Sequence, residues 1–467
     1  MDFLDVLISL MLKWNICFSQ KRTIGLAIRQ SLSCLCLAGR STITQGITFA
    51  GRDHLDWSSD YKLFSRSCWS IKNLFQPIVE ETTKYFENNY IVIAYDETKL
   101  KKTGKKIPGT QYHRDPLSPA FHTNMIYGLR VLQGSALLPL YNSKQAKNED
   151  QISVQARGIP VCFKNIPVVK KPGRKATEED LIEYNEAKKQ CNLSHYFLET
   201  VKETRKAYDA AGVFHKTIIA VTDGGFCNKT VFGAELDRTN ILTRCRRDAV
   251  LCYKAQEGSR LFYDKNKFTP EEVKNNPDIP WKEAEVFISG QRRQIRYKDI
   301  DNVLWQGGAK RKTLRLIVIA PTPYKISKNG KTYYRNPAFL LTDNFDASTI
   351  QLIQMYVDRW EIEVNHRDEK TILGVGQAQV WNENSVTKQP AFVVAAYSML
   401  ILASILCYGS TRTKEYNELP KWRNMSKRPS CNDLKNILTK YIIKNPNRLV
   451  KYGMYIEKDK IMTKLTA

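Results

Sequence analysis

Two short apolar runs, far apart in the chain, constrain its fold most. Residues 91–95 read Ile-Val-Ile-Ala-Tyr and residues 217–222 read Thr-Ile-Ile-Ala-Val-Thr, and an aspartate follows each run, Asp96 and Asp223. Continuous apolar runs of this length, rich in β-branched residues, are typical of strands buried on both faces of a sheet. Such strands need helices on both sides, so the sequence predicts an α/β protein with two central strands that end at these aspartates.

Helical spacing dominates two other parts of the chain. In residues 1–88 apolar residues recur at three and four positions, and Ser41 is the expected N-cap of a helix there. Such a domain either contacts DNA or plays a plain structural role. Thr177 and Asp180 form a pair resembling a capping box, and they open a long helix that Gly212 ends.

Further strands are expected between these segments and after them. Residues 122–132 and 136–141 predict two strands joined by a turn at Gln133-Gly134-Ser135. A strand at about 240–245 follows the second apolar run. Residues 250–342 alternate in polarity and carry turn residues, which predicts a β-rich insertion.

The order of these elements defines the expected architecture. With the insertion set aside, it is three strands, a helix, a strand, a helix, a strand and a helix, which is the ribonuclease-H-like order. We therefore predict an α/β fold with a ribonuclease-H-like catalytic core, interrupted by a β-rich insertion and preceded by a helical domain. The expected domains are 1–88 (helical, DNA-binding), 89–249 (first part of the core), 250–342 (insertion), 343–410 (second part of the core, with the catalytic helix) and 411–467 (basic C-terminal region).

The charge balance indicates a polyanionic partner. Lys and Arg number 72 and Asp and Glu number 47, a net charge of +25. A surplus of this size attracts polyanions, of which nucleic acid is the usual one, although a basic protein without such a role is the alternative. Two basic loops, at 99–114 and 170–175, suit contacts with a nucleic-acid backbone or are simply solvated.

The cysteines and the apolar segments place the protein in the cytoplasm. The eleven cysteines form no CxxC pair and the six histidines do not cluster, so we expect reduced thiols and no zinc site. Asp2 and Asp5 stand where a signal peptide would carry positive charge. Residues 391–408 approach membrane-spanning length, but a helix buried beneath a sheet gives the same pattern, and we expect the buried helix and no membrane partner.

A polar stripe marks the helix predicted at 346–373. On an ideal helix, Arg359, Glu363 and Lys370 fall within about 60° of Tyr356. An apolar seam beside the stripe consists of Ile353, Val357, Trp360 and Val364. Charged residues bordering a buried seam are unusual unless they line a site.

Geometry also selects among the acids of this helix. Glu361 and Glu369 lie away from the stripe, so Glu363 is the acid expected in the site. The plainer alternative is a surface ion pair between Arg359 and Glu363, worth only a few tenths of a kcal/mol.

Three carboxylates could then meet at one place. Ligands of open α/β sheets sit beyond the carboxyl ends of the strands, where Asp96 and Asp223 are expected. Together with Glu363 they would form an oxygen-rich site for two Mg²⁺ or Mn²⁺ ions. One ion would activate water or a 3′-hydroxyl, and the other would stabilise the leaving oxygen.

The run Tyr356-x2-Arg359-x3-Glu363-x6-Lys370 resembles the signature of bacterial insertion-sequence transposases of the DDE class, of the cut-and-paste type with a β insertion before the last acid. Tyr95-Asp96-Glu97-Thr98 and Thr222-Asp223-Gly224-Gly225 match the context of the first two acids. The segments 56–58 and 64–70 also resemble the helical region of this group. The resemblance covers most of the chain, and the C-terminal region matches least.

The resemblance implies a role for each site residue. Asp96, Asp223 and Glu363 would be the catalytic, metal-binding triad. Arg359 and Lys370 would grip phosphates flanking the cut. Tyr356 would hydrogen-bond a phosphate at the transposon end, and Trp305 in the insertion would stack on a flipped base if the second strand is cut through a hairpin.

The resemblance also implies the partners. They would be double-stranded DNA, as terminal inverted repeats and as target, and a second copy of the chain, because two ends are paired before insertion. No small-molecule substrate is expected. The protein would be cytoplasmic and associated with the bacterial nucleoid.

Three other functions fit parts of the pattern. A ribonuclease-H-like nuclease would cut DNA without joining it. A domesticated, inactive protein would only bind DNA, although the three acids and their stripe are intact. A glycoside hydrolase would also use paired carboxylates, but the charge of +25 and the expected reduced cysteines argue against an extracellular sugar enzyme.

Overall fold

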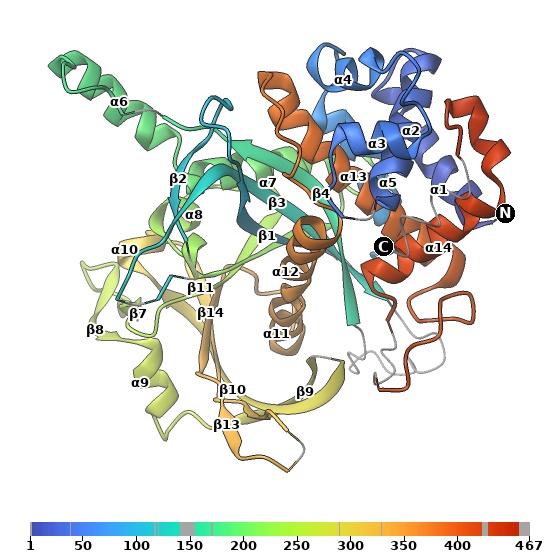
Figure 1. Ribbon diagram of the computed structural model, residues 1–467. Helices are drawn as coiled ribbons and strands as arrows, with labels where there is room; N and C mark the ends of the chain where they lie inside the picture. Colours follow the sequence, from blue (N-terminus) through green and yellow to red (C-terminus); the bar gives the residue numbers. More distant parts are fainter. Residues whose placement is uncertain are drawn as a thin grey trace.

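The computed structural model describes residues 2–37, 39–115, 118–119, 121–140, 155–169, 171–288, 290–327, 329–422 and 428–456. Within these residues, twelve strands form one mixed sheet and helices pack on both of its faces (Figure 1). The protein is therefore of the mixed α/β class, as predicted.

The helices cover the N-terminal part, the middle and the C-terminal part of the chain. They are α1 (Phe3–Leu12), η1 (Lys13–Ile16), α2 (Lys21–Cys36), α3 (Ile43–Phe49), α4 (Ser58–Ser65), α5 (Ile71–Thr83), α6 (Glu178–Gln190), α7 (Leu193–Ala210), η2 (Gly224–Phe226), α8 (Lys229–Phe232), α9 (Pro270–Asn275), α10 (Gln306–Ala309), α11 (Thr349–Asp358), α12 (Trp360–Arg367), the π-helical η3 (Asp368–Ile372), α13 (Glu383–Tyr408), α14 (Cys431–Lys444) and η4 (Pro446–Tyr452).

The large sheet runs in the order β2-β3-β1-β5-β6-β14-β11-β10-β7-β8, with β4 paired to β3 and β9 to β10, and β12 and β13 form a separate pair. The strands are β1 (Tyr90–Lys101), β2 (Gln111–Arg114), β3 (Met125–Leu140), β4 (Gln155–Ile166), β5 (Thr217–Thr222), β6 (Thr239–Arg244), β7 (Leu251–Lys254), β8 (Tyr263–Phe268), β9 (Lys282–Ile288), β10 (Gln291–Leu304), β11 (Thr313–Ile319), β12 (Pro323–Lys325), β13 (Thr332–Tyr334) and β14 (Ala338–Thr342).

The two apolar runs lie side by side as the parallel strands β1 and β5. Their pairing runs from Tyr90 with Thr217 to Ala94 with Val221. β5 ends before Asp223, as predicted, but β1 does not end at Asp96. It continues to Lys101 because its other edge stays paired with β3 in antiparallel fashion.

The strand β3 corrects the predicted turn at Gln133-Gly134-Ser135. The chain stays extended through these residues, with only an irregular register against β4 between Gly134 and Ser135. Gly134 is needed for close packing, since a Cβ there would lie 2.7 Å from the Cys162 sulfur and 2.8 Å from the Tyr95 ring. The three antiparallel strands of this part form a meander of β1, β3 and β4, and residue 141 of the predicted strand lies outside the described residues.

The long helix predicted after Thr177 consists of two helices. Thr177 and Asp180 form the expected capping box of α6, and Gly212, with φ of +84°, follows the last turn of α7. Between them Asn192 accepts a hydrogen bond from the backbone N–H of His195 and starts α7 afresh. The predicted N-cap Ser41 is also off by one residue, because Thr42 caps α3.

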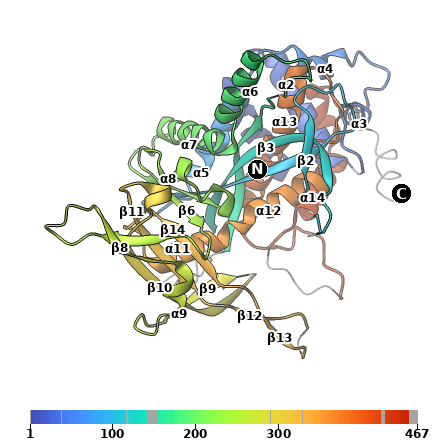
Figure 2. The same cartoon turned by 90° about the vertical axis from the view of Figure 1, so that its left-hand side faces the viewer.

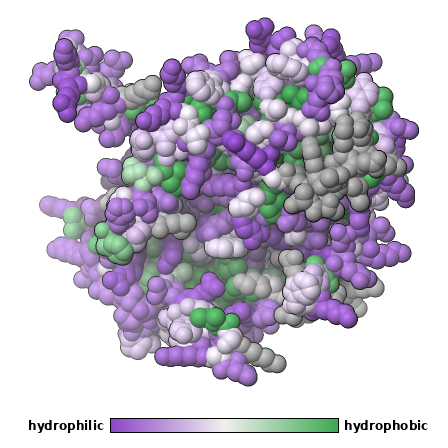
Figure 3. Space-filling view, in the orientation of Figure 1, coloured by the Kyte–Doolittle hydropathy of each residue, from purple (hydrophilic) through white to green (hydrophobic). Residues whose placement is uncertain are grey.

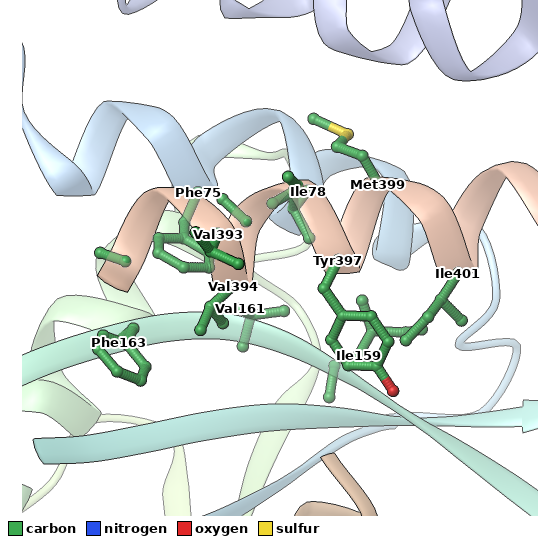
Figure 4. Packing of buried hydrophobic residues seen from close by; sticks show 14 of the residues in the cluster. Phe75, Ile78, Ile159, Val161, Phe163, Val393, Val394, Tyr397, Met399 and Ile401 are labelled. Carbon is green, nitrogen blue, oxygen red and sulfur yellow. The ribbon is translucent and has the colours of Figure 1, made fainter. Parts of the chain in front are cut away.

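The N-terminal helices share one core with the sheet, so residues 1–88 do not form a core of their own. Helix α13 lies between them and β4, and Figure 4 shows its side chains packed against α5 on one side and β4 on the other. α13 is long and apolar enough to span a membrane, but 78% of its most apolar window is buried inside the protein. It is therefore the predicted buried helix, which is consistent with a soluble protein.

The β-rich region continues the central sheet. β14 pairs with β6 on one edge and with β11 on the other, so the strands of residues 250–342 extend the sheet that contains β1 and β5. A second hydrophobic cluster lies on the face opposite α13 and includes Leu352 and Ile353 of α11 and Ile362 of α12. Figures 1 and 2 show α11 and α12 running along this face.

Candidate active site

Strand alternation turns Asp96 and Asp223 toward the same face. On β1, Val92 and Ala94 belong to the cluster under α11 and α12, and two residues further along the strand comes Asp96. Ile219 and Val221 of β5 belong to the same cluster, and Asp223 follows at the same spacing. Both aspartates therefore point to the side of the sheet that the predicted catalytic helix covers.

The register places the two aspartates at the same level. Val221 is opposite Ala94, so two further residues on each strand bring Asp223 beside Asp96. Oδ1 of Asp96 accepts a hydrogen bond from the N–H of Glu97, and Oδ1 of Asp223 accepts one from the N–H of Gly225. Within the described residues, Oδ2 of neither aspartate accepts a hydrogen bond, so one oxygen of each remains available for a cation.

The pKa of the Asp96 carboxyl group lies above its ordinary value. Burial raises its pKa to about 6, and the nearby charge of Asp223 acts in the same direction, while His366 and Arg359 oppose the shift. The side chain is 20% exposed. Two neighbouring carboxylates repel each other when both are ionised, so a cation that binds between them stabilises the charged pair.

Two clefts meet at Asp223. One, of about 1000 Å³, is lined by Asp223, Tyr356 and Arg359, and the other, of about 970 Å³, by Asp96, Asp223 and Lys370. The predicted tyrosine and arginine thus line one cleft with Asp223, and the predicted lysine lines the other with both aspartates.

Tyr356 lies in the last turn of α11, and Arg359 caps the C-terminal end of that helix. The guanidinium of Arg359 is 5.8 Å from the centre of the Tyr356 ring. Burial raises the pKa of Tyr356, so its hydroxyl stays a hydrogen-bond donor at neutral pH. Burial works against the charge of Arg359, yet the neighbouring Tyr356 and Glu363 leave the pKa of Arg359 raised.

Glu363 forms an ion pair with Arg359. Its Oε1 accepts a hydrogen bond from Nη2 of Arg359 at 2.8 Å, and its side chain is 34% exposed. In the part of the chain that the structure describes, no three His, Cys, Asp or Glu side chains are grouped closely enough to hold a metal ion. A triad therefore requires Asp96, Asp223 and Glu363 to move closer together than they are in this structure.

Lys370 lies in the π-helical turn η3 and contacts the Thr98 hydroxyl on β1. Burial lowers its pKa, while Glu369 and Asp96 favour its charged form. A π-turn holds more residues than an α-turn, so positions after Arg367 depart from the ideal helical wheel.

The sequence did not predict a buried row of polar side chains that leads from Asp96 through His366 and Glu369 to Gln133. Nε2 of His366 is 3.8 Å from Oδ2 of Asp96, and Nδ1 of His366 is 3.4 Å from Oε2 of Glu369. Oε1 of Glu369 accepts a hydrogen bond of 2.9 Å from Gln133 on β3. An ideal helix sets Glu369 apart from the stripe, but the structure buries it beside the site. The three-residue spacing of Glu363, His366 and Glu369 was the available signal.

The other acid set aside, Glu361, lies against β4. It accepts hydrogen bonds from Arg428 at 2.7 Å and from the backbone N–H of Gly158 at 3.2 Å. Its carboxylate is therefore committed to joining α12, β4 and the C-terminal region.

Trp305 packs on the core next to α10. Its ring meets that of Phe232 edge to face, with centroids 5.9 Å apart. A Cβ at Gly308 would lie 2.2 Å from the indole, so the helix turn closes over the ring. Trp305 does not line either cleft, and its role on a flipped base stays a prediction.

Basic side chains surround the two clefts. They are Arg40, Lys99, Lys101, Arg244, Arg246, Arg247, Lys274, Arg359 and Lys370. Arg246 and Lys274 form ion pairs with Asp248 and Glu271. Figure 3 shows that hydrophilic side chains cover most of one face of the molecule.

Lys102 departs from the prediction for the basic loop at 99–114. Its side chain is buried, and Nζ donates hydrogen bonds of 2.7 Å to the carbonyl oxygens of Gly376 and Ala378. Burial lowers its pKa to about 8. Lys102 therefore joins β1 to the segment after η3. Residue 170 of the second basic loop lies outside the described residues.

Comparison of the chain with models of known protein families gives no match, and comparison with curated proteins gives no significant match.

Proposed function

We propose that this protein is a DNA transposase of the DDE class that cuts and joins phosphodiester bonds with two divalent cations. One observation carries the proposal. Asp96 on β1 and Asp223, just after the parallel strand β5, stand at the same level and face α11 and α12, the helices around Tyr356, Arg359 and Glu363. Two hard carboxylates at a polar cleft with basic walls suit Mg²⁺ or Mn²⁺ and a phosphodiester.

The strand arrangement supports a ribonuclease-H-like core as part of this proposal. β3 is antiparallel to both β1 and β4, and β1, β5 and β6 are mutually parallel. Three meander strands, the α6–α7 helices, β5, a short helical connection, β6 and the α11–α12 helices follow one another in the expected order. In this proposal, the β-rich region between β6 and α11 would be the insertion, although its strands extend the central sheet.

Each protein group has a defined task in the proposed reaction. Bound cations would be held by Asp96, Asp223 and Glu363 and would supply Lewis acidity and an activated oxygen nucleophile. Arg359 would present its planar guanidinium to the scissile phosphate, and Lys370 would place a point charge on the other side of the aspartates. Tyr356 would donate its hydroxyl to a phosphate of the transposon end.

The partners belong to the proposal as well. Double-stranded DNA carrying terminal inverted repeats would lie along the basic clefts. Two copies of the chain would pair the two ends, and the protein would work in the bacterial cytoplasm at the nucleoid. Inverted repeats that flank this reading frame in its source DNA would supply the cognate substrate.

The decisive experiment measures Mg²⁺-dependent nicking and strand transfer on a labelled duplex that ends in those repeats. Wild-type protein should nick the end and join its 3′-hydroxyl to a target plasmid. Asp223→Ala should lose both activities and still shift the duplex on a gel, whereas Asp237→Ala, which removes an exposed aspartate, should keep them. Mg²⁺-dependent nicking by Asp223→Ala would contradict the assignment.

The same assay separates the alternative functions. A ribonuclease-H-like nuclease would give nicked DNA and no joined product. A protein that only binds DNA would shift the duplex without any metal-dependent nick.

A further inference from the structure

One ring nitrogen of the buried His366 faces Glu369, and the other has no hydrogen-bond partner among the described residues. The residue is 7% exposed. Nδ1 lies 3.4 Å from a carboxylate oxygen of Glu369, while Nε2 has no hydrogen-bond partner among the described residues. A buried nitrogen without a partner is costly, so the free position of this ring needs an explanation.

Glu369 fixes the orientation of the ring. Its side chain is 2% exposed, and its other oxygen accepts the hydrogen bond from Gln133 at 2.9 Å. Because a carboxylate accepts hydrogen bonds, the tautomer of His366 that suits this contact carries its hydrogen on Nδ1, facing Glu369. In the neutral ring, Nε2 then presents its lone pair toward Asp96.

That arrangement brings two electron-pair donors together. Nε2 of His366 and Oδ2 of Asp96 are 3.8 Å apart. Two ligand atoms at about 2.1 Å from one ion lie about 3 Å apart when adjacent and about 4.2 Å apart when opposite. The observed separation falls between these values, so a small side-chain movement lets both atoms reach one cation.

Resting on the proposed function, we propose that His366 is a ligand, through Nε2, of the cation bound by Asp96, with Glu369 as the carboxylate that holds the imidazole in place. Histidines that bind metals nearly always donate their other N–H to a carboxylate, a carbonyl or water, as His366 does to Glu369. His366 also follows Glu363 by three residues on α12, a spacing that puts a carboxylate and an imidazole on one helical face.

A nitrogen ligand changes which cation the site prefers. Mg²⁺ favours oxygen ligands, whereas imidazole suits transition metals, and Mn²⁺ accepts both. The site therefore prefers Mn²⁺ to Mg²⁺, and His366 is the source of the preference.

The test uses the full-length protein, stripped of metal, with Mn²⁺ alone. Pulsed electron paramagnetic resonance of bound Mn²⁺ should show coupling to a ¹⁴N nucleus, and titration calorimetry should give tighter binding for Mn²⁺ than for Mg²⁺. His366→Ala should lose the coupling and weaken Mn²⁺ binding by about tenfold or more, while Mg²⁺ binding changes by less than about threefold.

His113 provides the matched control. It is buried on β2, and its Nε2 is also without a hydrogen-bond partner within the described residues. His113→Ala should keep the ¹⁴N coupling. Circular dichroism verifies the fold of each variant, and His366→Gln, which keeps a polar side chain there, should also lose the coupling.

Two results would overturn the ligand role. Either a wild-type spectrum without ¹⁴N coupling or an unchanged spectrum in His366→Ala would show that His366 does not bind the cation. The DNA-nicking assay judges the proposed function separately. If nicking depends on Asp223 but the Mn²⁺ spectrum shows no ¹⁴N coupling, the role of His366 as a ligand is rejected and the proposed function stands.

Discussion

Arg359, at the junction of α11 and α12, forms an ion pair with Glu363, one turn further on in α12. Nη2 of the arginine and Oε1 of the glutamate are 2.8 Å apart. The pair joins two residues that need different partners in the proposed reaction, a phosphate for the arginine and a cation for the glutamate. Binding of a phosphate by Arg359 and binding of a cation by Glu363 would each compete with this ion pair.

Replacement of Arg359 by lysine tests the fork-like contact with phosphate. Arg359→Lys keeps the charge and loses the planar pair of donors, so the single-turnover cleavage rate should fall about ten- to a hundredfold, while the affinity for the repeat duplex changes little. Arg367→Lys, at an arginine on the same helix with 64% of its side chain exposed, is the control. Equal cleavage rates for wild type and Arg359→Lys would reject the contact.

The carboxyl group of Asp96 should reduce stability at neutral pH. Burial and the charge of Asp223 raise its pKa from 3.8 to about 6, so the folded protein holds the proton more tightly than the unfolded chain. Stability contributed by this group is present below pH about 4 and is lost as the pH rises to about 6. In metal-free buffer at pH 8, Asp96→Asn should therefore be more stable by up to about 3 kcal/mol.

Denaturant unfolding at several pH values measures this effect. The advantage of Asp96→Asn should shrink toward zero as the pH falls through the window from about 6 to about 4. Added Mn²⁺ should also reduce it, since a cation stabilises the ionised wild-type site. A variant that is no more stable than wild type at pH 8 would contradict the shift.

Replacement of two neighbouring lysines, Lys101 at the end of β1 and Lys102 after it, should affect different properties. The first should affect DNA binding and the second stability. Lys102→Met leaves the carbonyl oxygens of Gly376 and Ala378 without their donor, which should cost about 2 kcal/mol or more. Lys101 is exposed beside the Asp96 cleft, so Lys101→Met should change stability by less than about 0.5 kcal/mol and weaken DNA binding at low salt. Unfolding curves and gel shifts on both variants test the contrast.

Trp305 can be tested for a structural role. Removal of a ring packed on Phe232 and covered by Gly308 leaves a cavity, so Trp305→Ala should lower the free energy of unfolding by about 2–4 kcal/mol. If the indole also stacks on a flipped base, Trp305→Phe should keep hairpin products that Trp305→Ala loses. A wild-type unfolding curve for Trp305→Ala would mean that the ring does not support the core.

The sequence alone determined the features that depend on neighbours along the chain. The apolar runs that became β1 and β5, the capping box at Thr177 and the glycine stop at Gly212 follow from local periodicity and turn chemistry. The same periodicity assigned Asp223 to the end of a strand.

Only the tertiary structure decided which residues meet across elements. β1 passes Asp96 because β3 continues to pair with it, and β3 continues through Gly134 because Cys162 and the Tyr95 ring leave no room for a side chain there. His366 and Glu369 are neighbours three residues apart, but only the packing against β3 shows that Glu369 is buried beside the site, where its carboxylate accepts a hydrogen bond from Gln133. Periodicity encodes which side of an element is buried. It does not encode the register between strands or the groups opposite a buried side chain, because these depend on contacts between distant parts of the chain.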